Sequence, residues 1–180
     1  VPAGMPARVE NTFDVQSIDL AWSNEGGMLI FSRGGQGSPG VYARTLDSSL
    51  ALGDLVDIDL GQTAQVSVIY GEGMWAAAWL QTGVPVPDLS FVRFGRNGLR
   101  GSAQVIPSGA PGGVRLAYGQ NYFAAAWTQS GTNGEGQEVR APTLSLFDGL
   151  GDVVDTVVVP GPEVSGVARD ITWQGAQGFA

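Results

Sequence analysis

Four polar or charged residues recur at one position of a repeated pattern, three residues before an aromatic residue. They are Asp19, Ser67, Arg115 and Asp170, which precede Trp22, Tyr70, Tyr118 and Trp173. Two carboxylates can hydrolyse a glycosidic bond when they lie about 5–9 Å apart and one has a raised pKa. One hypothesis is therefore that Asp19 and Asp170 form a catalytic pair. The alternative is an ionic or hydrated lining in which Arg115 is offset by an aspartate.

A second set of polar residues lies in three short turns between apolar segments. The turns are Asn24-Glu25-Gly26, Glu72-Gly73 and Gln120-Asn121. We expect all three on one face of the fold, where amides and carboxylates can hydrogen-bond sugar hydroxyls or a protein partner. Solvated turns have the same composition, so a purely structural role is the alternative. The candidate ligand-binding residues are Asp19, Glu25, Glu72, Arg115, Gln120 and Asp170.

The composition excludes several kinds of site. The 180 residues include no cysteine and no histidine, so we expect no thiol nucleophile, no Ser-His-Asp triad and none of the usual zinc sites. All nine basic residues are arginine, and a net charge of −8 repels the phosphate backbone of nucleic acids. Asp57 and Asp59 share a predicted strand face, but no calcium-binding loop motif surrounds them. The sequence predicts no cofactor, no metal site and no nucleic-acid partner.

An internal repeat fixes the fold class. The segment "YGEGMWAAAWLQ" begins at Tyr70 and "YGQNYFAAAWTQ" begins at Tyr118, 48 residues later (118 minus 70). The same step relates Phe31 to Trp79 to Trp127. Self-similarity at this period is typical of architectures built from one repeated supersecondary unit.

Within each unit the apolar residues alternate with period two, which indicates strands. The second unit reads as four strands, Gln65–Tyr70, Met74–Gln81, Leu89–Phe94 and Arg100–Pro107. Four antiparallel strands in about 48 residues match the size of one β-propeller blade. Met74, Ala76 and Ala78 should face one way while Trp75, Ala77 and Trp79 face the other, because neighbouring blades cover both faces of a blade. The prediction is an all-β chain of about three and a half blades.

The first unit resembles a known family of repeats. "IDLAWSNEGGMLIFSR" (Ile18–Arg33) followed by "GVYARTLD" (Gly40–Asp47) is similar to the TolB-type, WD40-like propeller repeat of bacterial secreted proteins. Asn24-Glu25 depart from the proline and aspartate usual there, and the second and third units place Tyr-Gly where the family has Trp-Ser. The resemblance implies a propeller in an extracellular or periplasmic setting, and it implies no chemistry. No apolar run approaches the roughly 18 residues of a membrane helix, and the first residues lack a signal-peptide pattern, so we expect any such segment to have been removed.

Both ends of the chain fall inside a predicted blade. We expect residues 1–14 to end a preceding blade, 15–61, 62–109 and 110–161 to form three blades, and 162–180 to begin a further one. A propeller typically closes with 4–8 blades, and an open ring exposes apolar faces. The expected partner is therefore a second chain or another copy that completes the ring, unless the chain is a piece of a longer polypeptide. The expected function is a non-catalytic secreted module that binds a glycan or protein, and the alternative is an extracellular hydrolase that uses acidic residues.

Overall fold

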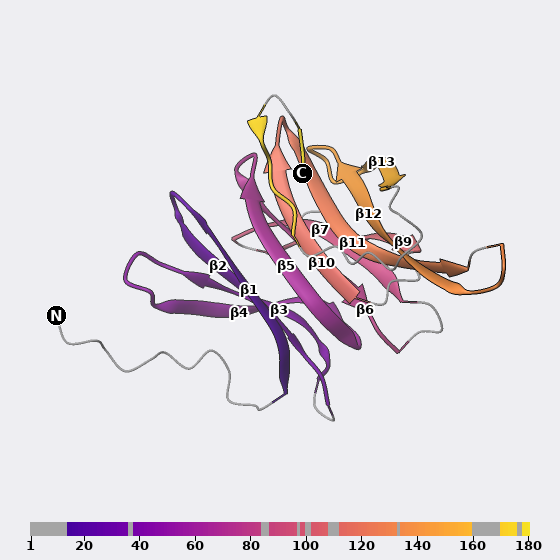
Figure 1. Cartoon of the computed structure of the whole chain (residues 1–180). Coiled ribbons are helices and arrows are strands. Elements are labelled where there is room, and N and C mark those ends of the chain that lie inside the picture. Colours follow the sequence, from indigo (N-terminus) through magenta and orange to yellow (C-terminus); the bar gives the residue numbers. More distant parts are fainter. Residues whose placement is uncertain are drawn as a thin grey trace, which may run out of the picture.

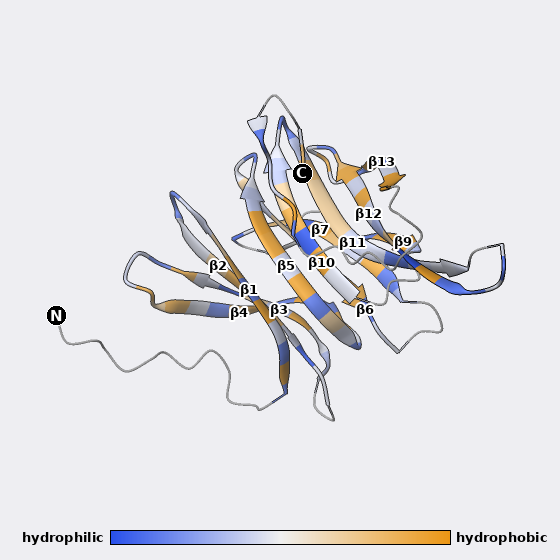
Figure 2. Ribbon diagram, in the orientation of Figure 1, coloured by the Kyte–Doolittle hydropathy of each residue, from blue (hydrophilic) through white to orange (hydrophobic). Residues whose placement is uncertain are grey.

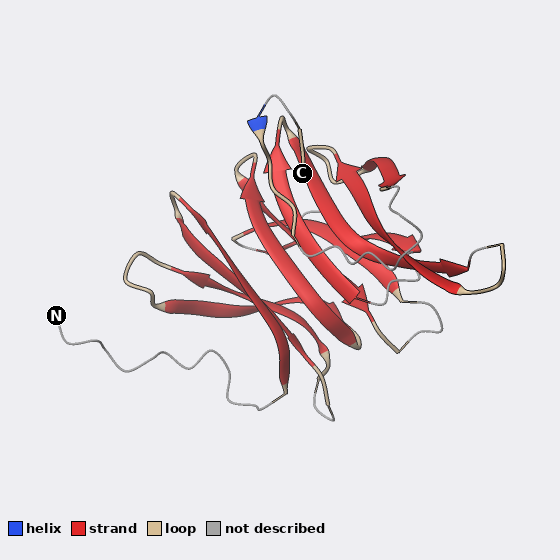
Figure 3. Ribbon diagram, viewed as in Figure 1, coloured by secondary structure: helices blue, strands red, loops and turns tan. Residues whose placement is uncertain are grey.

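The computed structural model describes thirteen strands in residues 14–35, 38–83, 87–96, 98–99, 102–107, 112–132, 134–159, 170–175 and 178–180. Figure 3 shows that this part of the chain consists almost entirely of strands and loops. The predicted all-β class is confirmed. Residues 1–13 of the predicted segment 1–14 lie outside the described residues. No helix in the described ranges is long and apolar enough to cross a membrane.

The strands form three antiparallel sheets in which consecutive strands are neighbours (Figure 1). The first sheet contains β1 (Val15–Ser23), β2 (Gly26–Arg33), β3 (Gly40–Leu46) and β4 (Leu52–Leu60). The second contains β5 (Thr63–Gly71), β6 (Met74–Gln81) and β7 (Asp88–Gly95), with β8 (Gly98–Leu99) and β9 (Gln104–Pro107) both paired to β7. The third contains β10 (Gly112–Gly119), β11 (Tyr122–Thr132), β12 (Glu138–Phe147) and β13 (Val153–Val158). Within the predicted fourth strand of the second unit, Arg100–Pro107, β9 is the described strand, and β8 precedes that range; residues 100 and 101 lie outside the described residues.

The repeated sequence phrase forms the hairpin between the first and second strands of a sheet. Gly71 pairs with Met74, and the two residues between them, Glu72 and Gly73, have φ values of +50° and +71°. The equivalent residues of the third sheet, Gln120 and Asn121, have φ values of +48° and +65°. Positive φ at both central residues defines the type I′ turn, whose twist matches the twist of the flanking strands.

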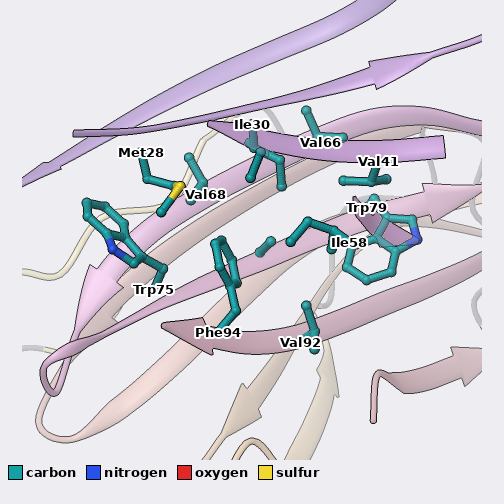
Figure 4. Packing of buried hydrophobic residues seen from close by; sticks show 12 residues of the cluster. Met28, Ile30, Val41, Ile58, Val66, Val68, Trp75, Trp79, Val92 and Phe94 are labelled. Carbon is teal, nitrogen blue, oxygen red and sulfur yellow. The ribbon is translucent and has the colours of Figure 1, made fainter. Parts of the chain in front are cut away.

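The three sheets stack face to face, and the second sheet is covered on both sides. Trp75, Ala77 and Trp79 pack against the first sheet, where they meet residues such as Met28 and Ile30 (Figure 4). Ala76 and Ala78 point the opposite way and pack against the third sheet. The predicted division of this strand between two faces is confirmed. Hydrophobic residues follow the central strands β5, β10 and β11, while many loop tips are hydrophilic (Figure 2).

At two successive places in the stack, an aromatic ring of one unit rests on a glycine of the sheet before it. A Cβ built on Gly71 would lie 2.4 Å from Cδ2 of Tyr118, and a Cβ on Gly119 would lie 2.2 Å from Cδ2 of Trp173. Neither distance is possible between real atoms without movement. These two glycines therefore let the rings of Tyr118 and Trp173 reach the backbone of the preceding sheet.

Residues 170–175 and 178–180 continue the stack on the far side of the third sheet. Trp173 and Phe179 form an isolated antiparallel bridge, and Thr172 and Ala180 exchange backbone hydrogen bonds of 2.9 and 3.0 Å. Ile171 packs against alanines of the third sheet and is 8% exposed. We call this segment the C-terminal hairpin.

On the outer side of the first sheet the apolar side chains of β1 are exposed, while Leu29, Phe31 and Tyr42 on the same side are buried. On β1, Ile18, Leu20 and Trp22 are 53%, 52% and 50% exposed. Their counterparts Val66 and Val68 on β5 are 1% and 5% exposed, because they pack against the preceding sheet. We call the surface formed by Ile18, Leu20 and Trp22 the open face.

Candidate functional site

The first strands of the three sheets lie beside one another and are linked by side chains at the repeated polar position (Figure 1). Asp19 Oδ2 accepts hydrogen bonds from the backbone N–H of Val68 at 2.9 Å and from the hydroxyl of Ser67 at 3.0 Å. Ser67 Oγ in turn accepts a hydrogen bond from the N–H of Leu116 at 3.2 Å. β5 and β10 are edge strands, so some of their N–H groups have no partner within their own sheet. Side-chain oxygens of the preceding sheet accept hydrogen bonds from these N–H groups.

This ladder of side chains ends at Arg115. A guanidinium group has donors and no acceptor, so Arg115 cannot accept a hydrogen bond as Asp19 and Ser67 do. It is exposed and donates to the carbonyl oxygen of Val114 at 2.9 Å. In the next unit, the N–H of Ile171 instead donates a hydrogen bond to Oδ1 of Asp170, at 2.9 Å.

The two aspartates of the proposed catalytic pair belong to different interfaces. Asp19 bonds between the first and second sheets, and Asp170 bonds inside the C-terminal hairpin. In the described part of the chain, no hydrogen bond or ion pair joins Asp19, Arg115 and Asp170 to one another. The ladder of Asp19 and Ser67 accounts for this position as structural links between sheets.

Asp57 and Asp59 do not share a face, contrary to the sequence analysis. A register shift between β3 and β4 places Asp57 opposite Tyr42 and Asp59 opposite Val41, so the two carboxylates are separated by the bulge. Asp59 Oδ2 accepts hydrogen bonds from Trp79 Nε1 at 3.0 Å and Gln81 Nε2 at 3.2 Å. This aspartate therefore anchors the first sheet to the second.

The turn residues that sequence analysis singled out contact the following unit. The backbone oxygen of Glu25 accepts a hydrogen bond from Nη2 of Arg96, in the second unit. The carboxylate of Glu72 lies against Gly149 of the third unit, where a Cβ would be 2.4 Å from Oε2. Gln120 is exposed at the tip of its turn. The first two turns thus border grooves between neighbouring sheets at one end of the stack.

Beside Glu72 is a cavity of about 210 Å³ between the second and third sheets, which we call the second cleft. It is lined by Phe91, Val92, Arg93, Ser102, Gln104, Leu150, Gly151 and Asp152. Gln104 Nε2 donates to Asp152 Oδ1 at 3.1 Å and so connects the two sheets across the cleft. The side chain of Leu150 is 81% exposed at its edge.

Arg93 is the central charged group of the second cleft. Its side chain is 8% exposed, and its Cζ lies 5.4 Å from the centroid of the Phe123 ring. The nearest carboxylate is that of Glu72, with 3.7 Å between Nη2 and Oε2. This separation is an ion pair but exceeds hydrogen-bond distance. Arg93 Nε is buried and has no hydrogen-bond partner.

Two other ionisable groups near the cleft have shifted pKa values. Backbone hydrogen bonds from Asp152 and then Leu150 hold the pKa of the Asp148 carboxyl below its ordinary value, and the charge of Arg93 adds a smaller effect. Burial, followed by the negative charge of Glu72, raises the pKa of Tyr118 above its ordinary value. Asp148 is therefore ionised and Tyr118 protonated at neutral pH, which leaves one cation among several carboxylates.

A similar groove of about 240 Å³, the first cleft, lies between the first sheet and Arg96. It is lined by Thr45, Leu46, Asp47, Ala51, Leu52, Gly53 and Arg96. The carboxylate of Asp47 is occupied by Ser49 and Ala51, since Oδ1 accepts hydrogen bonds from both, and these bonds lower the pKa of Asp47. The two clefts share a position in the stack but differ in their free polar groups.

Sequence analysis missed the residues of the second cleft. The only signal for Arg93 is one cation inside the apolar strand "LSFVRFG". Gln104 and Asp152 lie one repeat apart (152 minus 104 is 48), which is a hint that they occupy facing positions.

No family model and no curated protein matches this sequence. Among solved structures, the chain is similar to a subtype N10 neuraminidase-like protein of A/little yellow-shouldered bat/Guatemala, with a TM-score of 0.56 and 10% identity over 82% of this chain and 45% of that one. The fold is that of a partial β-propeller. A neuraminidase-like protein from A/bat/Guatemala gives a TM-score of 0.54 and 8% identity over 82% of this chain and 42% of that one. The chain spans less than half the length of either structure.

A third solved structure is described as "The GH130 family of mannoside phosphorylases contains glycoside hydrolases that target beta-1,2 mannosidic linkages in Candida mannan". The match covers 90% of this chain and 79% of that one. Its TM-score is 0.42 at 7% identity. The comparisons support a propeller and do not single out the TolB-type or WD40-like repeat family.

Proposed function

We propose that the chain is part of a secreted β-propeller that acts as a non-catalytic binding or assembly module for a glycan or protein, and that another chain or another copy completes its ring. The observation that carries this proposal is the open face. Ile18, Leu20 and Trp22 are about half exposed, whereas the equivalent valines of the second sheet are at most 5% exposed. Burying the remaining half of three such side chains contributes about 2–4 kcal/mol.

The repeated interface defines what a completing blade would supply. Tyr118 and Trp173 each rest on a glycine of the sheet before them, and Ser23 stands at the equivalent place before Tyr70, so we expect Trp22 to lie against a small residue of the completing blade. The N–H groups of Val68 and Leu116 bond to side-chain oxygens of the preceding sheet, whereas the equivalent N–H of Leu20 on β1 donates to Oδ1 of its own neighbour Asp19. The extracellular or periplasmic location follows from the resemblance of the first unit to TolB-type repeats.

Completion of the ring is tested by mass spectrometry of the protein purified from its source. The sample is measured first under native conditions and then after denaturation. We expect a complex heavier than 18.7 kDa that releases this chain with a second chain or a second copy. A lone 18.7 kDa particle would overturn the proposal, and so would one longer polypeptide that contains all the blades. Replacing Trp22 by serine should weaken the complex, while Tyr122→Ser, an exposed aromatic outside the open face, should leave it intact.

The alternative function is an extracellular glycoside hydrolase that uses acidic residues. It requires Asp19 or Asp170 to act with a second carboxylate on one substrate. Asp19→Asn and Asp170→Asn variants would then abolish hydrolysis of a glycan substrate, whereas a binding module would show no turnover with either side chain.

A further inference from the structure

We propose that the second cleft binds one neutral, hydroxyl-rich ring, of the size of a single hexose unit, between Arg93, Gln104 and Asp152. This inference rests on the binding role proposed above and does not depend on completion of the ring. The cleft is formed by the second and third sheets, both of which belong to this chain.

The first reason is a buried donor without an acceptor, Nε of Arg93. Arg93 is more than nine-tenths buried, lines the cleft, and makes no hydrogen bond to another described residue. A guanidinium group carries five N–H donors in a fixed planar arrangement. Donors that are removed from water and left unpaired destabilise a protein, and those in native structures need an explanation. A ligand oxygen at this place would supply the missing acceptor.

The second reason is the supply of acceptors on the opposite wall. Gln104 Nε2 already donates to Asp152 Oδ1. Gln104 Oε1 and Asp152 Oδ2 accept no hydrogen bond from the described residues. A hydroxyl group both donates and accepts. A ring that carries adjacent hydroxyls can therefore accept from Arg93 on one side and donate to Gln104 and Asp152 on the other.

The balance of charge selects a neutral ligand. Arg93 is the one cation that lines the cleft, and the carboxylates of Glu72, Asp148 and Asp152 lie on or close to it. Three negative charges against one positive charge disfavour a carboxylate, sulfate or phosphate ligand. An ammonium ligand is disfavoured as well, because it has no acceptor for the donors of Arg93.

The size and the walls of the cleft fit a single small ring. A volume of about 210 Å³ corresponds to roughly seven water molecules at about 30 Å³ each, and it is smaller than pockets for drug-sized ligands. Phe91 and the exposed Leu150 give it apolar surface. Gly151 leaves the space over Arg93 open, since a Cβ there would lie 3.5 Å from Cδ of Arg93.

The first cleft has no buried arginine in its lining and serves as an internal control. Arg96 is exposed and already donates to the carbonyl oxygen of Glu25. Asp47 Oδ1 is occupied by Ser49 and Ala51. A ligand that merely enters any groove between sheets would bind both clefts equally.

Nuclear magnetic resonance of the ¹⁵N-labelled chain tests this inference directly. The probes are methyl glycosides of neutral hexoses, neutral disaccharides built from the same hexoses, and glucuronate as the anionic counterpart. We expect the neutral sugars to shift the Nε–H signal of Arg93 and the amide signals of Leu150 and Gly151, with Kd in the range of about 1 mM. Disaccharides that bind more tightly than monosaccharides would indicate a polymeric glycan as the source, and equal affinities would indicate a free sugar.

Two residues outside the core, the half-buried Gln104 and the exposed Asp152, allow the contacts to be removed. Gln104→Ala and Asp152→Asn should each weaken binding by about tenfold or more, whereas Arg96→Gln in the first cleft should leave it unchanged. Preferential binding of glucuronate, equal shifts around both clefts, or no shift at Arg93 with any neutral hexose would overturn the inference. A monomeric chain that binds the sugars would refute ring completion alone, and a larger complex that binds none would refute the cleft alone.

Discussion

Replacing Gly71 by alanine tests whether the rings that rest on glycine hold the sheets together. The added Cβ would lie 2.4 Å from both Cδ2 and Cγ of Tyr118, while contacts under 3.4 Å are uncommon for real Cβ atoms. The ring must therefore move by about 1 Å, and overpacking of this kind costs roughly 1–3 kcal/mol. Alanine also reduces the entropy of the unfolded chain, which stabilises the protein by about 0.4–1 kcal/mol. The expected net loss is about 1–2 kcal/mol.

The assay is thermal unfolding followed by circular dichroism. For a chain of this length, a loss of about 1–2 kcal/mol lowers the Tm by roughly 2–8 °C. Gly61→Ala is the matched control, because a Cβ there meets no atom within 4 Å, and it should leave the Tm unchanged or slightly raised. Adding Gly71→Ala to a Tyr118→Ala variant should cost nothing further. If Gly71→Ala were as stable as Gly61→Ala, the aromatic-on-glycine contact would have no role in holding the sheets.

Two further predictions concern the carboxylates. Asp19→Ala removes the acceptor for Ser67 and Val68 and should destabilise the chain by about 1–3 kcal/mol in urea unfolding, whereas Asp170→Ala, which loses one hydrogen bond to the adjacent residue, should have a smaller effect. The pKa of Asp148 is lowered in the folded state, so its contribution to stability is present above about pH 4 and is lost as the pH falls through the folded pKa. A series of Tm values from about pH 6 to pH 2.5 should therefore fall less steeply for Asp148→Asn than for the unsubstituted chain, and parallel curves would contradict the cause assigned to this shift.

The fold could be predicted because strand periodicity and the 48-residue repeat are properties of the sequence alone. Alternation along Met74–Gln81 assigns each side chain to a face, and the structure has Trp79 on one face and Ala78 on the other. The position of the turn at Glu72-Gly73 was likewise visible between two alternating apolar segments, whereas the positive φ of Glu72 was not. These features depend on local backbone preference and on burial, and both act over a few residues.

The second cleft could not be predicted because it depends on how two sheets are offset. Its walls come from β7 and from the turn after β12, and no local pattern states that these segments meet. Within a strand, Arg93 looks like a solvated cation, and only the packing of Phe123 beside it makes it buried. The prediction that Asp57 and Asp59 share a face is wrong for a similar reason. The bulge in β4 adds one residue, which changes the alternation of faces along the strand.

The stacking of three sheets also has a consequence for how stability is distributed along the chain. Each sheet packs only on its immediate neighbours, so the free energy is approximately a sum of the stability of each sheet and of each contact between adjacent sheets. The second sheet takes part in two extensive contacts, and the first takes part in one. Opening should therefore begin at the first sheet, and the amides of β6 should exchange with solvent more slowly than those of β2. A blade bound to the open face would stabilise the first sheet against opening. It would therefore slow amide exchange throughout the first sheet, including residues that it does not contact.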